Sequence, residues 1–134
     1  MSIFNTIKIG ELGKVVTGKT PPSSRPELFG ATYPFLTPTD IDGHARYIQP
    51  SRFLSEEGRV SQSRLLLPRN AVCVVCIGAT IGKTCMAQVP SFTNQQINAV
   101  VVNKAEYDPI FAYYILFPFR GRDERVRAFS HSSP

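Results

Sequence analysis

Two glycine-lysine-threonine turns are the residues in this 134-residue chain that most suggest chemistry. Residues 13–20 read G-x-x-x-x-G-K-T, the pattern of loops that wrap phosphate oxygens with backbone N–H groups and open into a helix. Here Pro21, Pro22 and Pro26 follow, and proline lacks an N–H and disfavours helical geometry in the residue before it. Residues 78–84 carry a second version that is one residue too short. The sequence therefore predicts tight basic turns between short strands rather than a nucleotide site.

Metal and catalytic groups are poorly supported by the spacing of the remaining residues. Cys73 and Cys76 have the spacing of a zinc ligand pair, but a fourth ligand is lacking and the chain has only two histidines. Residues 72–77 look like a buried strand, in which positions three apart face opposite sides. Asp40 and Asp42 are more typical of a turn cap than of an acid pair. We therefore expect no metal site and no catalytic residue.

An amide cluster stands before an apolar strand, in the order T-N-Q-Q-I-N over residues 93–98. Its side chains include Asn94, Gln95 and Gln96, and such amides match the major-groove edge of adenine. Alternatively, they bond to the backbone of a neighbouring turn such as residues 78–82. We favour the second interpretation, because most side-chain hydrogen bonds go to backbone or water.

The charge balance favours arginine, with ten arginines among fifteen basic residues and a net charge of +5. The guanidinium fork pairs bidentately with phosphates and with guanine edges, which an ammonium group cannot do. Arginines recur through the middle of the chain, from Arg25 to Arg69. They indicate either solvated loops that keep the protein soluble or a face that meets a polyanion.

These residues are positioned by a chain that reads as one α+β domain, rich in β-structure. We expect a twisted sheet or a small, partly open barrel with short peripheral helices. The expected strands are residues 14–17, 33–36, 46–48, 64–67, 71–77 and 99–102. A turn is expected at residues 68–70, and a brief helix from Ser55 toward Gln62.

The last quarter of the chain changes to helical character. Asp108 is a good N-cap and Pro109 a good first residue for a helix over residues 110–117. That helix is apolar nearly all round, which predicts burial. Residues 120–129 suggest a second, charged helix. Neither a secretory signal nor a membrane-spanning apolar run is present in the sequence, so we expect a cytoplasmic protein.

Several motifs in order resemble the target recognition domain of type I restriction-modification specificity subunits. They comprise T-G-K-T-P at residues 17–21, Y-P-F-L-T-P-T-D-I at 33–41, S-E-E-G at 55–58, L-P-R at 67–69, C-I-G-A-T-I-G-K at 76–83 and T-N-Q-Q-I-N at 93–98. Together they cover residues 10 to about 117. The resemblance implies a non-catalytic subunit for sequence-specific DNA recognition that reads one half of a split target site.

The resemblance also implies partners and cofactors. Double-stranded DNA would be the ligand, and methylation subunits, with restriction subunits bound through them, would supply the S-adenosylmethionine, ATP and magnesium chemistry. Members of the family usually carry two recognition domains and long spacer helices. Residues 1–134 would then form a single recognition domain that lacks closing strands and a spacer helix, and that self-associates or pairs with another specificity fragment.

Motifs shared by domains that read different sequences cannot choose the sequence, so they shape the fold or grip phosphates. The candidates for backbone contacts are Lys19, Thr20, Arg59, Arg64 and Lys83. The candidates for reading bases lie mostly between motifs and are Arg25, His44, Arg46, Tyr47 and Arg52. Asn94, Gln95 and Gln96 are either structural or in contact with DNA.

Two other functions stay open. A fragment that binds methylation or other specificity subunits without binding DNA is the second hypothesis. A nucleotide-hydrolysing enzyme, suggested only by the pattern at residues 13–20, is the third.

Overall fold

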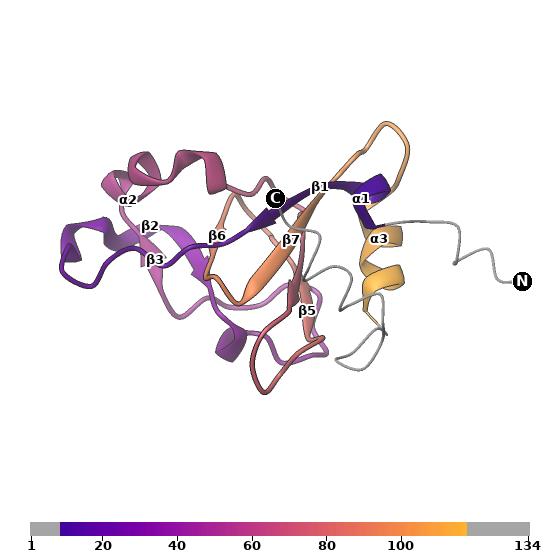
Figure 1. Cartoon of the computed structure of the whole chain (residues 1–134), viewed down its shortest axis with the longest axis horizontal. Helices are drawn as coiled ribbons and strands as arrows, with labels where there is room; N and C mark the ends of the chain where they lie inside the picture. The colour runs from indigo at the N-terminus through magenta and orange to yellow at the C-terminus, as the bar shows by residue number, and fades with distance from the viewer. Residues whose placement is uncertain (1–8, 118–134) are drawn as a thin grey trace, which may run out of the picture.

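The computed structural model describes residues 9–117, in which two open β-sheets are joined by short helices (Figure 1). The first sheet has the order β1 (Gly13–Thr17), β7 (Ile97–Val102), β4 (Val72–Val75) and β5 (Thr84–Met86), with antiparallel neighbours throughout. The second has the order β3 (Phe53–Leu54), β2 (Phe29–Leu36) and β6 (Phe92–Thr93), with β2 and β6 parallel. The α+β class with open sheets is confirmed.

Within the described residues, the α-helices are α1 (Ile9–Leu12), α2 (Glu56–Ser61) and α3 (Pro109–Leu116). The 3-10 helices are η2 (Pro26–Leu28), η3 (Pro38–Asp40) and η4 (Ser63–Leu65). Both predicted N-caps are present. The Ser55 hydroxyl accepts a hydrogen bond from the Gly58 N–H at 3.1 Å, and the Asp108 carboxylate accepts one from the Ile110 N–H at 2.8 Å. These side chains satisfy amide donors that have no partner within the helix.

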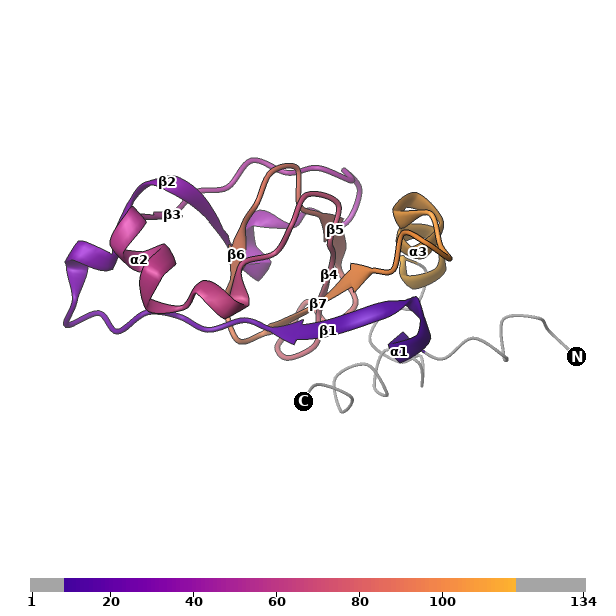
Figure 2. The ribbon, with the colours of Figure 1, turned by 90° about the horizontal axis from the view of Figure 1, so that it is seen from above.

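Strand β4 is buried on both faces, so it forms the centre of the molecule. Its residues alternate between two apolar clusters: Val72 and Val74 pack on the side of α3, whereas Cys73 and Val75 pack on the side of the second sheet. Cys76 follows on the α3 side. The two cysteines therefore face opposite sides, as the period of two predicts. Figure 2 shows the resulting order along the long axis: α3, the first sheet, and then the second sheet with α2.

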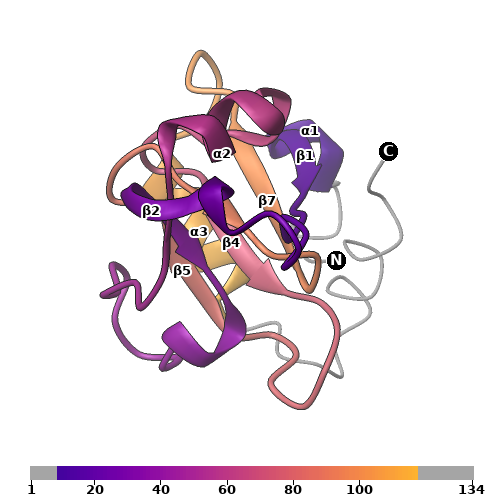
Figure 3. The ribbon, with the colours of Figure 1, turned by 90° about the vertical axis from the view of Figure 1, so that its left-hand side faces the viewer.

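Apolar side chains connect the two sheets. Leu36 at the end of β2, Ile41 and Leu67 pack with the cluster that lies on the second-sheet side of β4. The second sheet has its own small cluster, which is centred on Phe35 and Phe92. These contacts join segments that are far apart in sequence and lie between the two sheets. Figure 3 shows the backbone of the molecule from its α2 end.

Two predicted strands are wrong. Residues 46–48 contain no strand, although the Arg46 carbonyl accepts a hydrogen bond from the Met86 N–H at 2.7 Å. Of residues 64–67, the first two belong to η4, and Leu67 makes only an isolated bridge with Ser91. The predicted turn at residues 68–70 is confirmed by a hydrogen bond from the Ala71 N–H to the Pro68 carbonyl.

The predicted burial of α3 all round is also wrong. Ala112, Tyr113 and Leu116 are buried against β4 and β5, but Phe111 and Tyr114 on the other face are 44% and 57% exposed. Among the residues that the structure describes, the other face has partial cover only, such as the ring of Tyr107 that stacks on Phe111. The helix predicted over residues 120–129 lies outside the described residues. Within residues 9–117, no helix is long and apolar enough to cross a lipid bilayer.

Candidate nucleic-acid interface

The first GKT turn has no free amides at Gly18 and Lys19 to offer a phosphate. The Gly18 N–H donates to the Ile97 carbonyl at 3.2 Å, and the Lys19 N–H donates to the Thr93 carbonyl at 3.0 Å. The segment after the turn leads through a bend into η2 rather than into an α-helix. The turn therefore serves to join β1 to the amide segment, and the interpretation that excludes a nucleotide loop agrees with this geometry.

The amide segment is also hydrogen-bonded to the chain before the second GKT turn. The Gln96 side chain donates to the Ile77 carbonyl at 3.5 Å, and the Cys76 N–H donates to the Gln96 carbonyl at 2.8 Å. This bond of Gln96 goes to the backbone of Ile77, one residue before the predicted range 78–82. Gln95 is exposed and accepts a hydrogen bond from the Thr20 hydroxyl at 2.6 Å. DNA contact by these amides stays a prediction.

Asp42 caps a loop, as the sequence predicts. Its carboxylate accepts hydrogen bonds from the N–H groups of His44 and Ala45 at 2.7 and 2.9 Å. These bonds, with a smaller contribution from the charges of His44 and Lys83, lower the pKa of Asp42 below its ordinary value.

Asp40 has a separate structural role. It accepts hydrogen bonds from the Thr37 N–H at 3.1 Å and from the Ser51 hydroxyl at 2.8 Å, which holds η3 to the segment before β3. The two acids therefore serve as caps of different turns and do not form an acid pair.

Arg46 lies in the same loop region as His44 and has an unused donor. Its Nε is buried and has no hydrogen-bond partner among the described residues. Its guanidinium carbon lies 5.6 Å from the centre of the Tyr47 ring, and the Tyr47 hydroxyl donates to the Asn70 side chain at 2.8 Å. The fork is thus held against an anchored aromatic ring, an arrangement that can present a guanidinium edge to a base.

Arg52 is held at a different place, directly before β3 of the second sheet. Its guanidinium carbon lies 4.6 Å from the centre of the Phe29 ring and 5.4 Å from that of Phe35. Its carbonyl accepts a hydrogen bond from the Phe35 N–H at 2.9 Å, and a hollow of about 270 Å³ adjoins it, lined also by Ser51 and Phe53. Arg46 and Arg52 therefore present two forks in separate parts of the described surface.

Two other predicted site residues are already paired. Arg25 lies 3.0 Å from Glu27, and Arg59 forms an ion pair with Glu56. The hydrogen bond from Arg59 lowers the pKa of Glu56, and Glu56 in turn raises the pKa of Arg59. Each arginine must give up or share its carboxylate to bind a phosphate, so both are weaker candidates than the cations without an ion pair in the described part of the chain.

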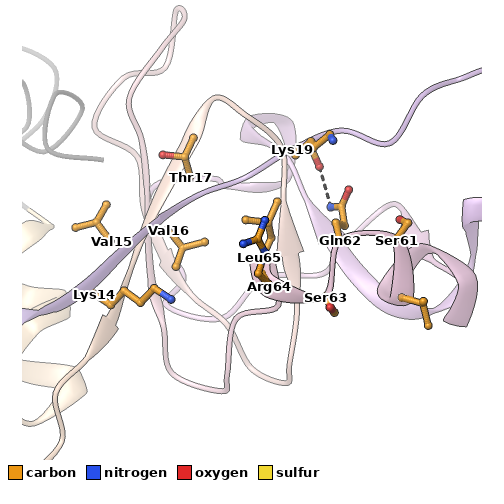
Figure 4. A pocket seen from close by; sticks show the side chains of 11 residues that line it. Lys14, Val15, Val16, Thr17, Lys19, Ser61, Gln62, Ser63, Arg64 and Leu65 are labelled. Carbon is orange, nitrogen blue, oxygen red and sulfur yellow. Dashed lines mark hydrogen bonds between the residues drawn. The ribbon is translucent and has the colours of Figure 1, made fainter. Parts of the chain in front are cut away.

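An open groove of about 480 Å³ runs between β1 and the segment from α2 to η4. Its basic residues are Lys14, Lys19 and Arg64, all exposed (Figure 4). The sequence did not single out Lys14 as a site residue. Val15, Val16 and Thr17 in β1 line the groove as well, so the alternation of the strand does not single out Lys14.

The candidates for phosphate contacts that form no ion pair within residues 9–117 therefore fall into two sets rather than one face. The groove holds Lys14, Lys19 and Arg64, whereas Lys83 belongs to the loop that leads into β5. That loop extends away from α2 in Figures 1 and 3. The prediction that Lys19 and Lys83 hold phosphates from equivalent turns thus involves two distinct surfaces.

The cysteines do not add a reactive or metal-binding site. Burial raises the pKa of the Cys76 thiol to about 11, so it stays protonated near neutral pH. Among residues 9–117, no three His, Cys, Asp or Glu side chains come together as a possible metal site.

Comparison with known proteins gives one consistent family. The "Type I restriction modification DNA specificity domain" family matches residues 1–121. The type I restriction enzyme HindI specificity subunit of Haemophilus influenzae is 38% identical over 93 residues, which are 69% of this chain and 20% of that protein.

Two solved structures have a similar fold. The HsdS subunit from Thermoanaerobacter tengcongensis matches 96% of this chain and 29% of its own, with a TM-score of 0.62 and 16% identity. A structure that describes complex assembly and conformational transition of the type I R-M system matches 84% of this chain and 27% of its own, with a TM-score of 0.60 and 17% identity.

The chain spans only about a fifth to a third of the lengths of these relatives. The family match nevertheless covers most of its residues, including every motif and both cation sets described above. The chain belongs to the family of type I restriction-modification DNA specificity domains.

Proposed function

We propose that this chain recognises a specific DNA sequence as the target recognition domain of a type I specificity subunit, reading one half of a split site. The observation that carries the proposal is the family match over residues 1–121. The cations of the groove and the two aromatic-backed arginines, Arg46 and Arg52, support it, because polyanion binding and base reading need these groups.

Specificity subunits are the non-catalytic recognition subunits of type I systems, so this chain is not an enzyme. The partners would be methylation subunits and, through them, restriction subunits, in line with the type I complex assembly that one similar structure describes. S-adenosylmethionine, ATP and magnesium would be bound by those partners. A cytoplasmic location follows from the proposal, because the DNA to be read lies there.

We assign roles to the predicted residues by their surroundings. His44, Arg46, Tyr47 and Arg52 would read base edges, with Arg25 as a weaker candidate because of its pairing with Glu27. The backbone contacts would come from Lys19, Thr20, Arg64 and Lys83, and less from Arg59, which Glu56 neutralises. The chain would act as a single recognition unit.

A selection experiment tests this function. The chain, together with methylation subunits of a type I system, is incubated with duplexes of random sequence, and the bound fraction is amplified and sequenced through several rounds. We expect enrichment of one short motif, because each wrong base pair costs about 1–3 kcal/mol in a specific site. Bound DNA with the base composition of the starting pool would contradict sequence recognition.

A second function is favoured by the exposed face of α3. Ile110, Phe111 and Tyr114 are between 39% and 57% exposed, and Phe111 stacks on Tyr107 with ring centres 6.3 Å apart. Such a face suits association with another protein, including a second specificity fragment. An interaction fragment that does not bind DNA would show no salt-dependent affinity for any duplex, which separates it from the first function.

A further inference from the structure

We infer that the groove between β1 and η4 binds the phosphate backbone of duplex DNA without regard to sequence, through Lys14, Lys19 and Arg64. The inference rests on the proposed function. It assigns positioning on the duplex to this groove and base reading to the other surface loops. It also adds Lys14 to the residues that bind DNA.

The charge of the groove carries the inference. The eleven residues that line it include the three cations and no carboxylate. None of the three cations forms an ion pair with a carboxylate of residues 9–117. A positive groove with low-dielectric walls concentrates anions and holds them more strongly than isolated surface charges do.

A second hollow on the other side of α2 has the opposite sign of charge. It shares Val60 and Ser61 with the groove, but it is lined by Glu56 and Glu57 together with Arg25. An anion would be repelled from that side of α2 and attracted to the other. The boundary between the two signs of charge therefore follows α2 and sets the edge of the surface that a polyanion can occupy.

The groove is also built before any ligand arrives. The Gln62 side chain, which is 8% exposed, donates to the Lys19 carbonyl at 3.1 Å and ties the GKT turn to the beginning of η4 (Figure 4). The Lys19 N–H donates to Thr93 on the other side of the turn. Because both walls are fixed, little ordering of the backbone is needed when an anion binds.

The groove has few groups with which to read bases. The Thr17 hydroxyl donates to Asn98 at 2.6 Å, and the Ser61 hydroxyl donates to the Gly58 carbonyl at 2.7 Å. The Gln62 amide is used by Lys19. Charged groups are left as the main ligands of an incoming molecule, and charges recognise a phosphate that is the same at every base pair.

The test measures how affinity for a duplex of scrambled sequence depends on salt. It compares the native chain, bound to its methylation subunits, with Lys14→Ala, Lys19→Ala, Arg64→Ala and the triple variant. Each lost phosphate contact should reduce the slope of log affinity against log salt by about 0.9, and the triple variant should lose about three times that. Lys104→Ala is the matched control, since Lys104 is exposed and lies outside the groove.

Two further results would overturn the inference. Unchanged slopes in the groove variants, with intact thermal unfolding, would show that DNA lies elsewhere. A loss of binding to the methylation subunits with an unchanged DNA slope would assign the groove to an acidic protein surface. Failure of the proposed function would give a different result, namely a native chain with no preference for a selected sequence. The groove variants, by contrast, should lower affinity equally for selected and scrambled duplexes.

Discussion

At the scale of single residues, the G-K-T pattern serves a structural need that its resemblance to a phosphate loop conceals. A Cβ atom on Gly18 would run into the backbone oxygens of Thr93 and Asn94 and into the Thr93 hydroxyl. Glycine is required there because two backbones approach closely, and not because of an unusual dihedral angle. The same approach lets Lys19 enter the groove beside Lys14.

Gly18→Ala should therefore destabilise the fold by about 1–3 kcal/mol, as other overpacked sites do. Gly10→Ala is a matched control, because a Cβ at that helical position would have no atom of residues 9–117 within 4 Å apart from its chain neighbours and its own helix backbone. It should be neutral or stabilising by up to about 1 kcal/mol. Urea unfolding measures both, and equal midpoints for the two variants would contradict the close-approach argument.

The same turn predicts the absence of ATP binding. Its Gly18 and Lys19 amides are already bonded to carbonyl oxygens, so they cannot surround a phosphate. Calorimetry should detect no ATP binding by the native chain and no change in Lys19→Ala. ATP binding by the native chain that disappears in the variant would show that the turn opens to hold phosphates.

The contribution of Arg52 to sequence preference should depend on its planar guanidinium fork rather than on its charge. On a selected duplex, Arg52→Ala should cost about 1–3 kcal/mol of binding free energy, and much less on a scrambled duplex. Arg52→Lys keeps the charge but loses both the fork and the stacking on Phe29, so it should lose the same preference while retaining affinity for scrambled DNA. Full sequence preference in Arg52→Lys would assign Arg52 to a phosphate.

At the scale of elements, the sequence predicts those parts whose local signals agree with their packing. Helices α2 and α3 have caps that fix their beginnings, and the β-branched runs at β4 and β7 match their burial. By contrast, β3 and β6 have two residues each, and β6 pairs with β2 in parallel across a long stretch of sequence. Such strands form because of tertiary pairing and leave little periodic signal.

The prediction of site residues has the same limit, because the sequence does not show which of them the fold brings together. The sequence identifies Lys19 and Arg64 one by one, but only the folded chain brings them together with Lys14 in one groove. It also cannot show that Arg25 and Arg59 are paired with carboxylates. Helix α3 gives the clearest error, because an apolar pattern all round predicts burial even where only one face is buried among the described residues.

The exposed face of α3 predicts self-association of the isolated chain. Phe111→Gln combined with Tyr114→Gln should shift sedimentation toward the monomer, because it removes an exposed apolar patch. Val60→Gln is the matched control, since Val60 is 62% exposed but lies on α2, and it should leave association unchanged. A native chain that sediments as a monodisperse monomer at high concentration would contradict this prediction.

At the scale of the whole molecule, the groove cations and the aromatic-backed arginines Arg46 and Arg52 lie on different parts of a core built from two open sheets. The groove combines Lys14 and Lys19 with Arg64, whereas Arg46 and Arg52 each lie against an aromatic ring. Under the proposed function, this division would let the shared motifs hold the fold and bind the backbone while the segments between them vary the base contacts.

The most direct test of sequence recognition is the ratio of affinities for a selected and a scrambled duplex at one salt concentration. It is measured for the chain with its methylation subunits, and for the Lys83→Ala and Arg46→Ala variants. The native ratio should be well above one, Lys83→Ala should lower both affinities about equally, and Arg46→Ala should reduce the ratio by a factor that corresponds to about 1–3 kcal/mol. A native ratio of one, or a ratio that changes with Lys83 and not with Arg46, would contradict the proposed recognition of DNA by these loops.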